Sequence, residues 1–234
     1  MSDLSYIVAA DLGQISDSTA IVVLERQEPW RGPVTYDVIH AERLALGTPY
    51  TKVPDALRRI WGPLQQRWVD VQWEARGEGA RLADAPIELI IDVTGVGRPV
   101  LDLLNASGVH PVAVTITARR DATEPKMGEW HVPKRDLVSS VNTAMQSRRL
   151  RAASTLSEWP VLEAELRNFR ARISLSGHDS YGAGPTDEWR MGSHDDLVLS
   201  LALAIWWGER MQNYELDPAI LRAFADGGLP SPRW

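Results

Sequence analysis

The sequence contains no cysteine, which excludes disulfide bonds, thiolate zinc sites and cysteine nucleophiles, and which fits a reducing compartment. The N-terminus has no basic segment followed by an apolar core, so we expect no signal peptide. The longest apolar run, Leu197 to Trp207, is too short to cross a bilayer, and we expect no membrane partner. The chain also lacks internal repeats and low-complexity tracts.

The net charge of −6 argues against a protein coated in nucleic acid, but the charge is unevenly distributed. Residues 1–118 carry 10 basic and 15 acidic side chains, and residues 173–234 carry 4 and 9, so each region has a net charge of −5 (10 − 15 and 4 − 9). Residues 119–172 carry 11 basic and 7 acidic side chains, a net charge of +4 (11 − 7). This middle region is the candidate for contact with a polyanion, although a solvated helical surface would explain the same excess.

Apolar segments and helical periods predict an α/β fold. The first three predicted strands follow one another through short connections, which favours antiparallel neighbours. The later strand, helix, strand series implies a parallel crossover. Together they predict a mixed five-stranded sheet, three antiparallel strands then parallel strands, sandwiched by helices. The predicted strands are Tyr6–Leu12, Ser18–Glu25, Tyr36–Leu44, Ile87–Val93 and His110–Ile116. The predicted helices are Lys52–Trp68, Pro99–Asn105, Lys134–Leu150, Trp159–Ile173 and Asp195–Met211.

The remaining segments are rich in polar residues, glycine and proline. Ala75–Pro86 and Ser174–Arg190 are predicted to be loops, the second with short strands as an alternative. Arg119–Val132 has no helical period and contains Pro125 and Gly128, so we expect a hairpin or long loop that projects from the sheet. No domain boundary is evident, and we expect a single domain over residues 1–234, with residues 214–234 as a C-terminal tail.

Three buried segments end or begin at carboxylates. The first predicted strand runs into Asp11, the fourth ends at Asp92, and the last helix begins at Asp195 and Asp196. That helix is apolar on nearly every face and belongs in the core, so its acidic start should be held against the sheet. Each acid alone has a simpler explanation, because aspartate also suits turns, caps and the first turn of a helix. The combination of the three positions is what indicates a functional site.

Carboxylates that converge from distant segments predict a site for divalent metal ions, because hard cations prefer oxygen ligands. Without metal, such carboxylates would repel one another. Hydrolysis of a phosphodiester commonly uses two ions roughly 3.5–4 Å apart, one beside the attacking water and one at the leaving oxygen. Asp17 is either a turn residue or an additional ligand, and His194 is either a ligand or a polar residue that flanks the helix.

The segments that carry these acids resemble the nuclease domain of bacteriophage large terminases, in the RNase H/RuvC-like superfamily. The matching segments are Ala10-Asp11-Leu12-Gly13-Gln14, Asp17-Ser18-Thr19-Ala20, Ile91-Asp92-Val93-Thr94-Gly95-Val96-Gly97 and His194-Asp195-Asp196-Leu197-Val198-Leu199-Ser200-Leu201-Ala202. Val132-Pro133-Lys134-Arg135-Asp136-Leu137-Val138 is also similar to the link into the next helix of that family. The order of elements agrees over roughly residues 5–212.

The resemblance implies an RNase H-like fold and metal ligands at Asp11, Asp92 and one of the last acidic pair. RuvC-like enzymes place the acid directly before the apolar helix, which favours Asp196 as catalytic, with Asp195 and His194 in support. Asp17 matches an additional acid of similar terminases. The implied cofactors are two Mg²⁺ or Mn²⁺ ions.

The activity that the resemblance implies is endonucleolytic cleavage of double-stranded DNA during viral genome packaging, with little sequence specificity. The products would carry a 5′-phosphate and a 3′-hydroxyl. The implied partners, besides DNA, are an ATPase domain or subunit, the small terminase and the portal, and the implied location is the cytoplasm of the host bacterium.

One feature of complete large terminases is not found in this sequence. They carry an ATPase before the nuclease, whereas this chain has no Gly-x-x-x-x-Gly-Lys-Ser/Thr segment and starts at the first nuclease strand. We therefore expect an isolated nuclease domain or a split-off subunit, without an ATPase domain.

Other functions stay open at this point. An actin-like ATPase or sugar kinase also has a strand that ends in Asp-x-Gly, but it needs a second phosphate loop, for which Gly95-Val96-Gly97 is a poor substitute. A RuvC-like junction resolvase would share the metal chemistry and would favour a dimer and branched DNA. A non-catalytic DNA-binding subunit would tolerate the loss of any one acid.

Basic side chains bracket the predicted hairpin in the middle region. We expect them to contact the phosphates of DNA near the metal site, and the alternative is a plain surface loop. No recognition-helix or zinc motif is evident, so readout of base sequence is not expected. The candidate DNA-binding residues are Arg119, Arg120, Lys126, Lys134 and Arg135.

Overall fold

The computed structural model describes residues 2–13, 17–76, 81–175 and 195–211. The strands are β1 (Ser2–Asp11), β2 (Ala20–Pro29), β3 (Thr35–Arg43), β4 (Ile87–Asp92), β5 (Val112–Thr117), β6 (Thr123–Lys126), β7 (Glu129–Pro133) and β8 (Leu150–Ala152). The helices are α1 (Val53–Arg76), α2 (Gly97–Ala106), α3 (Lys134–Gln146), α4 (Trp159–Leu175) and α5 (Asp196–Met211), with short 3-10 helices at Tyr50–Lys52 and Leu82–Asp84.

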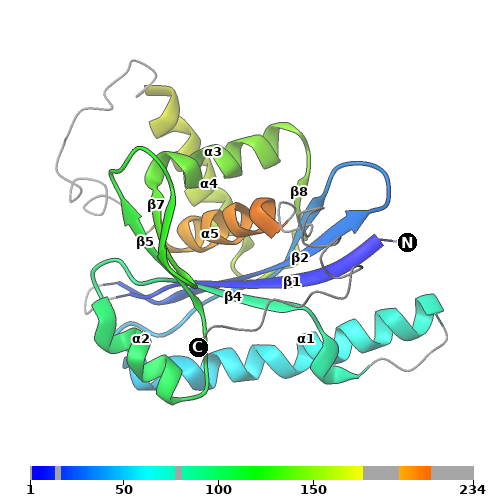
Figure 1. The fold of residues 1–234 in the computed structure, drawn as a ribbon. Helices are drawn as coiled ribbons and strands as arrows, with labels where there is room; N and C mark the ends of the chain where they lie inside the picture. The colour runs from blue at the N-terminus through cyan, green and yellow to red at the C-terminus, as the bar shows by residue number, and fades with distance from the viewer. Residues whose placement is uncertain (1, 14–16, 77–80, 176–194, 212–234) are drawn as a thin grey trace, which may run out of the picture.

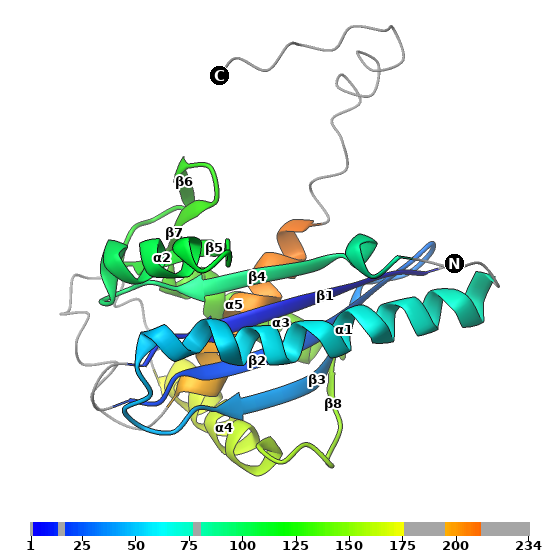
Figure 2. The same ribbon diagram turned by 90° about the horizontal axis from the view of Figure 1, so that it is seen from below.

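The strands form one sheet that separates two layers of helices. Among the described residues it has eight strands, in the order β6-β7-β5-β4-β1-β2-β3-β8. Helices α1 and α2 lie on one face, and α3, α4 and α5 lie on the other (Figure 1). The view from below in Figure 2 shows α1 running along the sheet. The first three strands are antiparallel, whereas β4 is parallel to β1 and β5 is parallel to β4. This confirms the predicted α/β class, a mixed sheet between two layers of helices.

The prediction of five strands was too low. The segment Arg119–Val132 does not simply project from the sheet, because β7 joins the sheet parallel to β5, and β6 pairs with β7 as a hairpin. Val132 of β7 is buried in the core that contains α5, and this burial favours the position of β7 within the sheet. The predicted helix Lys134–Leu150 ends early, at Gln146, and Arg148 then adopts a positive φ of 56° before β8 pairs with β3.

Two predicted helices extend beyond their expected ends. Helix α1 continues to Arg76 because Trp68 and Val71 still pack against the core, so the predicted loop at Ala75–Pro86 begins later. Helix α4 continues to Leu175. The rest of the predicted loop Ser174–Arg190, His194 and the predicted tail lie outside the described residues.

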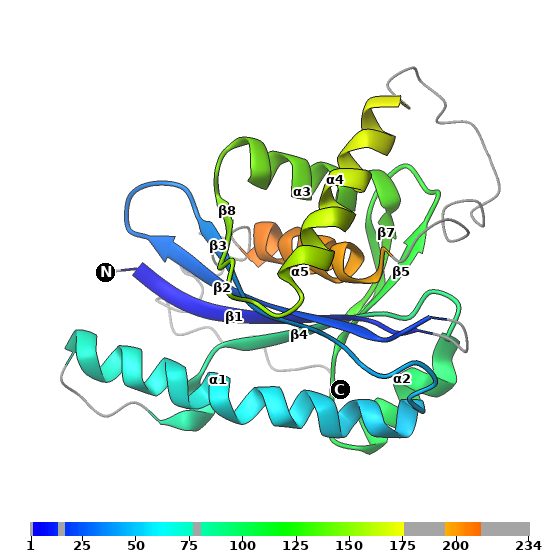
Figure 3. The ribbon, with the colours of Figure 1, turned by 180° about the vertical axis from the view of Figure 1, so that it is seen from behind.

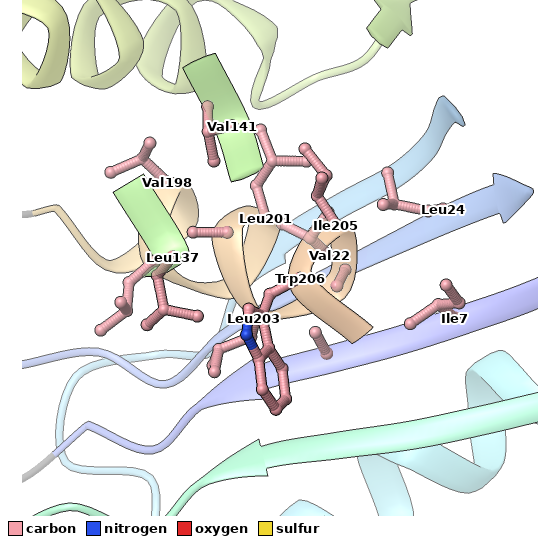
Figure 4. Close-up of a cluster of buried hydrophobic side chains, with 14 of the residues drawn as sticks. Ile7, Val22, Leu24, Leu137, Val141, Val198, Leu201, Leu203, Ile205 and Trp206 are labelled. Atoms are coloured by element: carbon pink, nitrogen blue, oxygen red, sulfur yellow. The ribbon is translucent and has the colours of Figure 1, made fainter. Parts of the chain in front are cut away.

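Helix α5 is the centre of the larger core. Every residue from Leu197 to Gly208 is buried, as expected for a helix that is apolar all round. Figure 4 shows Ile7 of β1 and Val22 of β2 on one side of α5 and Leu137 of α3 on the other. Figure 3 shows the same layering from behind, with α3, α4 and α5 on one side of the sheet and α1 and α2 on the other. Neither α5 nor any other described helix is long and apolar enough to span a membrane.

Strand β1 is apolar on both faces because both faces are covered. Ile7 and Ala9 belong to the core around α5, whereas Tyr6, Val8 and Ala10 belong to the core around α1 and α2. Successive side chains of a strand point to opposite faces, so a strand between two helical layers has no polar side. This double burial leaves the ends of the strand as the positions where charge can be placed.

Gly208 allows α5 to approach the sheet closely. A Cβ atom at this position would lie 2.6 Å from Cε1 of Tyr36 and 2.9 Å from Cδ1 of Ile7, and both side chains are fully buried. We expect Gly208→Ala to lower the free energy of unfolding by about 1–3 kcal/mol through overpacking, measured by urea denaturation. In Gly62→Ala the new Cβ would meet no atom within 4 Å, so this control in α1 should be neutral or more stable. Equal stability of Gly208→Ala and the wild type would contradict the close approach.

Candidate metal centre

Strands β1 and β4 bring two acids to the same edge of the sheet. The strands are parallel neighbours, and Asp11 is the register partner of Asp92. Neighbouring strands lie about 4.8 Å apart, so the two backbones are adjacent at the carboxyl ends. Ala9 and Ile90, two positions earlier in each strand, belong to the core around α5. By alternation, Asp11 and Asp92 both point to the α5 face of the sheet.

The backbone around Asp92 is fixed by two short hydrogen bonds. The side chain is 1% exposed, and its Oδ1 accepts a hydrogen bond of 2.7 Å from the amide of Thr94. The hydroxyl oxygen of Thr94 in turn accepts one of 2.7 Å from the amide of Ile116 in β5. The turn that follows β4 is therefore held by the next strand, which restricts how the Asp92 carboxylate can rotate.

Ser200 joins Asp11 to the start of α5. Its buried Oγ accepts a hydrogen bond of 3.0 Å from the amide of Asp11. The same Oγ lies 3.0 Å from the carbonyl oxygen of Asp196 and 3.1 Å from that of Ala20, and its single proton can be donated to either. One hydroxyl thus connects the end of β1, the start of β2 and the first turn of α5. Asp196 is the first residue of that turn.

A fourth carboxylate, Glu165 of α4, lies beside the start of α5. It is 5% exposed, and its Oε2 accepts a hydrogen bond of 2.9 Å from the amide of Val198. Burial raises the pKa of Glu165 to about 7; repulsion from Asp196 and Asp195 acts in the same direction, against the Val198 amide and Arg43. The acids at the start of α5 and Glu165 therefore lie close enough to disfavour the charged form of Glu165.

The sequence prediction missed both Ser200 and Glu165. A signal for Glu165 was present, because it lies on the buried stripe of α4 between Leu162 and Leu166, where an acid is unexpected. Ser200 gave a similar signal as the single hydroxyl within the apolar run of α5. Polar residues inside an apolar stripe are rare enough that each indicates a specific partner.

Further groups belong to the surroundings of Asp11. Burial and the negative charge of Asp11 raise the pKa of Tyr50, in the 3-10 helix before α1. A Cβ on Gly13 would overlap the backbone of Asp17 and Ser18, so glycine is needed for the tight turn there. Asp17 itself is exposed, and Asp195 is half-buried directly before α5.

The acids are neighbours, but they do not form a closed ligand set. Within the described ranges, no group of three or more Asp, Glu or His side chains is arranged so that it could hold a metal ion. The donor chemistry nevertheless fits a hard divalent cation, because it consists of carboxylate oxygens. Buried Oε1 of Glu165 also has no hydrogen-bond partner among the described residues. Carboxylates repel one another when no cation lies between them.

The candidate DNA-binding residues separate into two places. Arg119 and Arg120 follow the carboxyl end of β5, and Lys134 and Arg135 follow the carboxyl end of β7, on the edge where β4 ends. Arg135 donates a hydrogen bond to the backbone oxygen of Arg120. Lys126 is in β6, beside the start of β7, in an ion pair of 2.9 Å with Glu129, roughly 15 Å along β7 from Lys134.

Three solved structures are similar to this chain. The large terminase nuclease from thermophilic phage G20c is 18% identical, with a TM-score of 0.44 over 86% of this chain and 81% of that one. The Mn-soaked human cytomegalovirus terminase nuclease domain is 9% identical, with a TM-score of 0.41 over 92% and 85%. Thermus thermophilus RuvC is 12% identical, with a TM-score of 0.35 over 90% and 97%. No protein-family model and no curated protein sequence matches the chain.

The three contacts of Ser200 can be tested against a matched serine. Ser140 of α3 makes the same hydrogen bond within its helix, of 2.9 Å to the carbonyl oxygen of Asp136, but no hydrogen bond from its side chain to another element in the described part of the chain. Ser200→Ala leaves the partly buried amide of Asp11 without its acceptor, so we expect a loss of about 1–3 kcal/mol in the free energy of unfolding. Ser140→Ala should cost less than about 0.5 kcal/mol, as surface changes usually do. Equal losses in urea denaturation would show that the contacts between elements contribute little.

Proposed function

We propose that this chain is a metal-dependent endonuclease that hydrolyses double-stranded DNA. The observation that carries the proposal is the in-register pairing of Asp11 with Asp92 at the ends of neighbouring parallel strands, together with the Ser200 link from Asp11 to the first turn of α5. Asp196 is thereby brought to the acids of the sheet. Carboxylates on rigid strand ends and a helix start suit a metal site better than carboxylates on loops.

The acids have separate roles in this proposal. When bound, two Mg²⁺ or Mn²⁺ ions would activate a water molecule and stabilise the leaving oxygen of the phosphodiester. Asp11 and Asp92 would hold the ion on the water side. Asp196, with Asp195 or Asp11, would hold the ion on the side of the leaving oxygen, and Asp17 and His194 would have supporting roles.

The basic residues would position the DNA backbone at this edge. Arg119, Arg120, Lys134 and Arg135 lie at the carboxyl ends of β5 and β7, on the edge that carries Asp92, which supports a duplex path over the acids. Lys126 would contact a phosphate farther along the hairpin. Contacts of this kind fix the register of the duplex without reading its sequence.

We also place the activity in viral genome packaging. The order of the acid-bearing segments supports this assignment, since it matches the terminase nuclease pattern over most of the chain. In that setting the partners would be an ATPase domain or subunit, the small terminase and the portal, in the cytoplasm of the host bacterium.

The decisive experiment is digestion of a plasmid by the wild type and by Asp92→Asn in magnesium, in manganese and with a chelator. Asparagine keeps the oxygen that accepts the Thr94 amide but removes the charge. We expect cleavage to fall by more than about 100-fold, the scale seen when a charge-stabilising group leaves an active site. Stability should be unchanged or higher, because repulsion between the acids is relieved.

Asp70→Asn is the matched control for this experiment. Asp70 is exposed on α1, on the other side of the sheet, so its charge should not affect cleavage. Full activity of Asp92→Asn, or cleavage that persists with the chelator, would refute the proposed function and leave a DNA-binding subunit.

The DNA path is tested by the salt dependence of binding. Changing Arg119, Arg120 and Lys126 together to glutamine should reduce the slope of log K against log salt by about 2–3, because up to three fewer counterions are released. Lys126→Gln alone should account for at most about one unit. The control is the pair Arg58→Gln and Arg59→Gln on α1, which should leave the slope unchanged. An unchanged slope in the triple variant would place the DNA elsewhere.

A further inference from the structure

The first turn of α5 receives a hydrogen bond from another helix. The first amides of a helix have no acceptor within that helix, and a side chain just before the helix usually caps one of them. In α5 the amide of Val198, the third helical residue, donates instead to Oε2 of Glu165 in α4, across 33 positions of sequence. Glu165 therefore caps α5 from outside and ties its start to α4.

The carboxylate of Glu165 that caps α5 lies where its charge is unfavourable. Glu165 is almost fully buried, and the charged groups that act on it are Asp196 and Asp195, which repel it, and Arg43 of β3, which attracts it. Arg43 is shared, since its Nε lies 3.3 Å from the carboxylate of Glu158. A buried carboxylate next to two others lowers the stability of the fold, because burial and repulsion both disfavour its charge. A neutral acceptor, or an ordinary N-cap residue, could hold the amide without that cost.

The position of Asp196 follows from this contact. Asp196 precedes Val198 by two residues in the same turn, so a shift of that turn moves the Asp196 carboxylate relative to Asp11 and Asp92. Ser200 restrains one side of the turn and Glu165 restrains another. Metal ligands commonly need such outer contacts, and losing one typically weakens metal binding 10–100-fold.

We propose that Glu165 is a positioning residue of the metal centre, which holds the first turn of α5 through the Val198 amide so that Asp196 is presented to the metal ion. This inference rests on the proposed function, because it presumes that Asp196 is a metal ligand. Glu165 acts through the helix backbone, and its hydrogen-bond acceptor is the feature that matters.

Three variants of the full chain separate the acceptor from the charge. Glu165→Gln keeps an oxygen that accepts from Val198 but removes the charge, whereas Glu165→Leu removes the acceptor and fills the same buried space. Glu163→Gln is the control on the same helix, since Glu163 is partly exposed and pairs with Arg167 at 2.7 Å. Binding of Mn²⁺ is measured by calorimetry without DNA, beside thermal unfolding and the manganese dependence of plasmid cleavage.

We expect Glu165→Gln and Glu163→Gln to bind Mn²⁺ within about threefold of the wild type, and Glu165→Leu to bind about 10–100-fold more weakly. The weak binding of Glu165→Leu should appear even where its thermal stability equals or exceeds that of the wild type, which a merely structural role would not produce. If Glu165→Leu does not fold, Glu165→Ala takes its place with the same expectation.

Two results would overturn the inference. Wild-type Mn²⁺ affinity in the folded Leu or Ala variant would show that the cap does not position Asp196. Equal weakening in Glu165→Gln and Glu165→Leu would show that the charge acts directly on the ion. If the wild type binds Mn²⁺ and Asp92→Asn is inactive, either result removes only this inference. If the wild type does not bind Mn²⁺ and Asp92→Asn still cleaves, the proposed function itself fails.

Discussion

The complete burial of α5 constrains the rest of the described structure. A helix that is apolar on every side cannot lie on a surface, so it needs a sheet on one side and helices on the other. The face of the sheet below it is supplied by β1 and β2, and the cover is supplied by α3 and α4. Asp195 and Asp196 cannot enter that core as unpaired charges, so the helix must begin at the edge of the sheet. Strands β1 and β4 end at the same edge, where they carry Asp11 and Asp92.

Both ends of α5 are fastened by polar contacts to distant parts of the chain. At its C-terminal end, the carbonyl oxygen of Gly208 accepts a hydrogen bond of 3.1 Å from Arg26. Glu209 accepts hydrogen bonds from the hydroxyl of Tyr36, at 3.0 Å, and from Arg149, at 2.6 Å. The unsatisfied carbonyl groups of a helix end favour cations there. At the start of the helix, the hydroxyl of Ser200 makes contacts with the backbone of β1 and β2. Both ends of α5 are therefore tied to the sheet.

The sequence was most informative where apolar runs stop. The ends of β1 and β4 and the start of α5 were predicted to within one residue, because a change from buried apolar residues to acids is a strong local signal. The hairpin alternative for Arg119–Val132 agrees with β6 and β7, but the pairing of β7 with β5 was not predicted and β8 was missed. Both strands are short, and their pairing with β5 and β3 is a tertiary property. The roles of Glu165 and Ser200 depend on partners 33 and 189 positions away, which no local pattern encodes. Their presence on apolar stripes was visible, but their partners were not.

The double burial of β1 and β4 has a consequence for how the sheet assembles. Register is normally specified by a strand having one apolar and one polar face, since a slip by one residue exchanges the faces. The buried centres of these two strands are apolar on both faces apart from Glu88, so that rule distinguishes the correct pairing from a slipped one only weakly. A slip would, however, turn Asp92 toward the core of α1 and α2, where it has no place. The cost of burying a charge at Asp92 therefore favours the correct register, in which Asp11 and Asp92 lie side by side at the edge of the sheet.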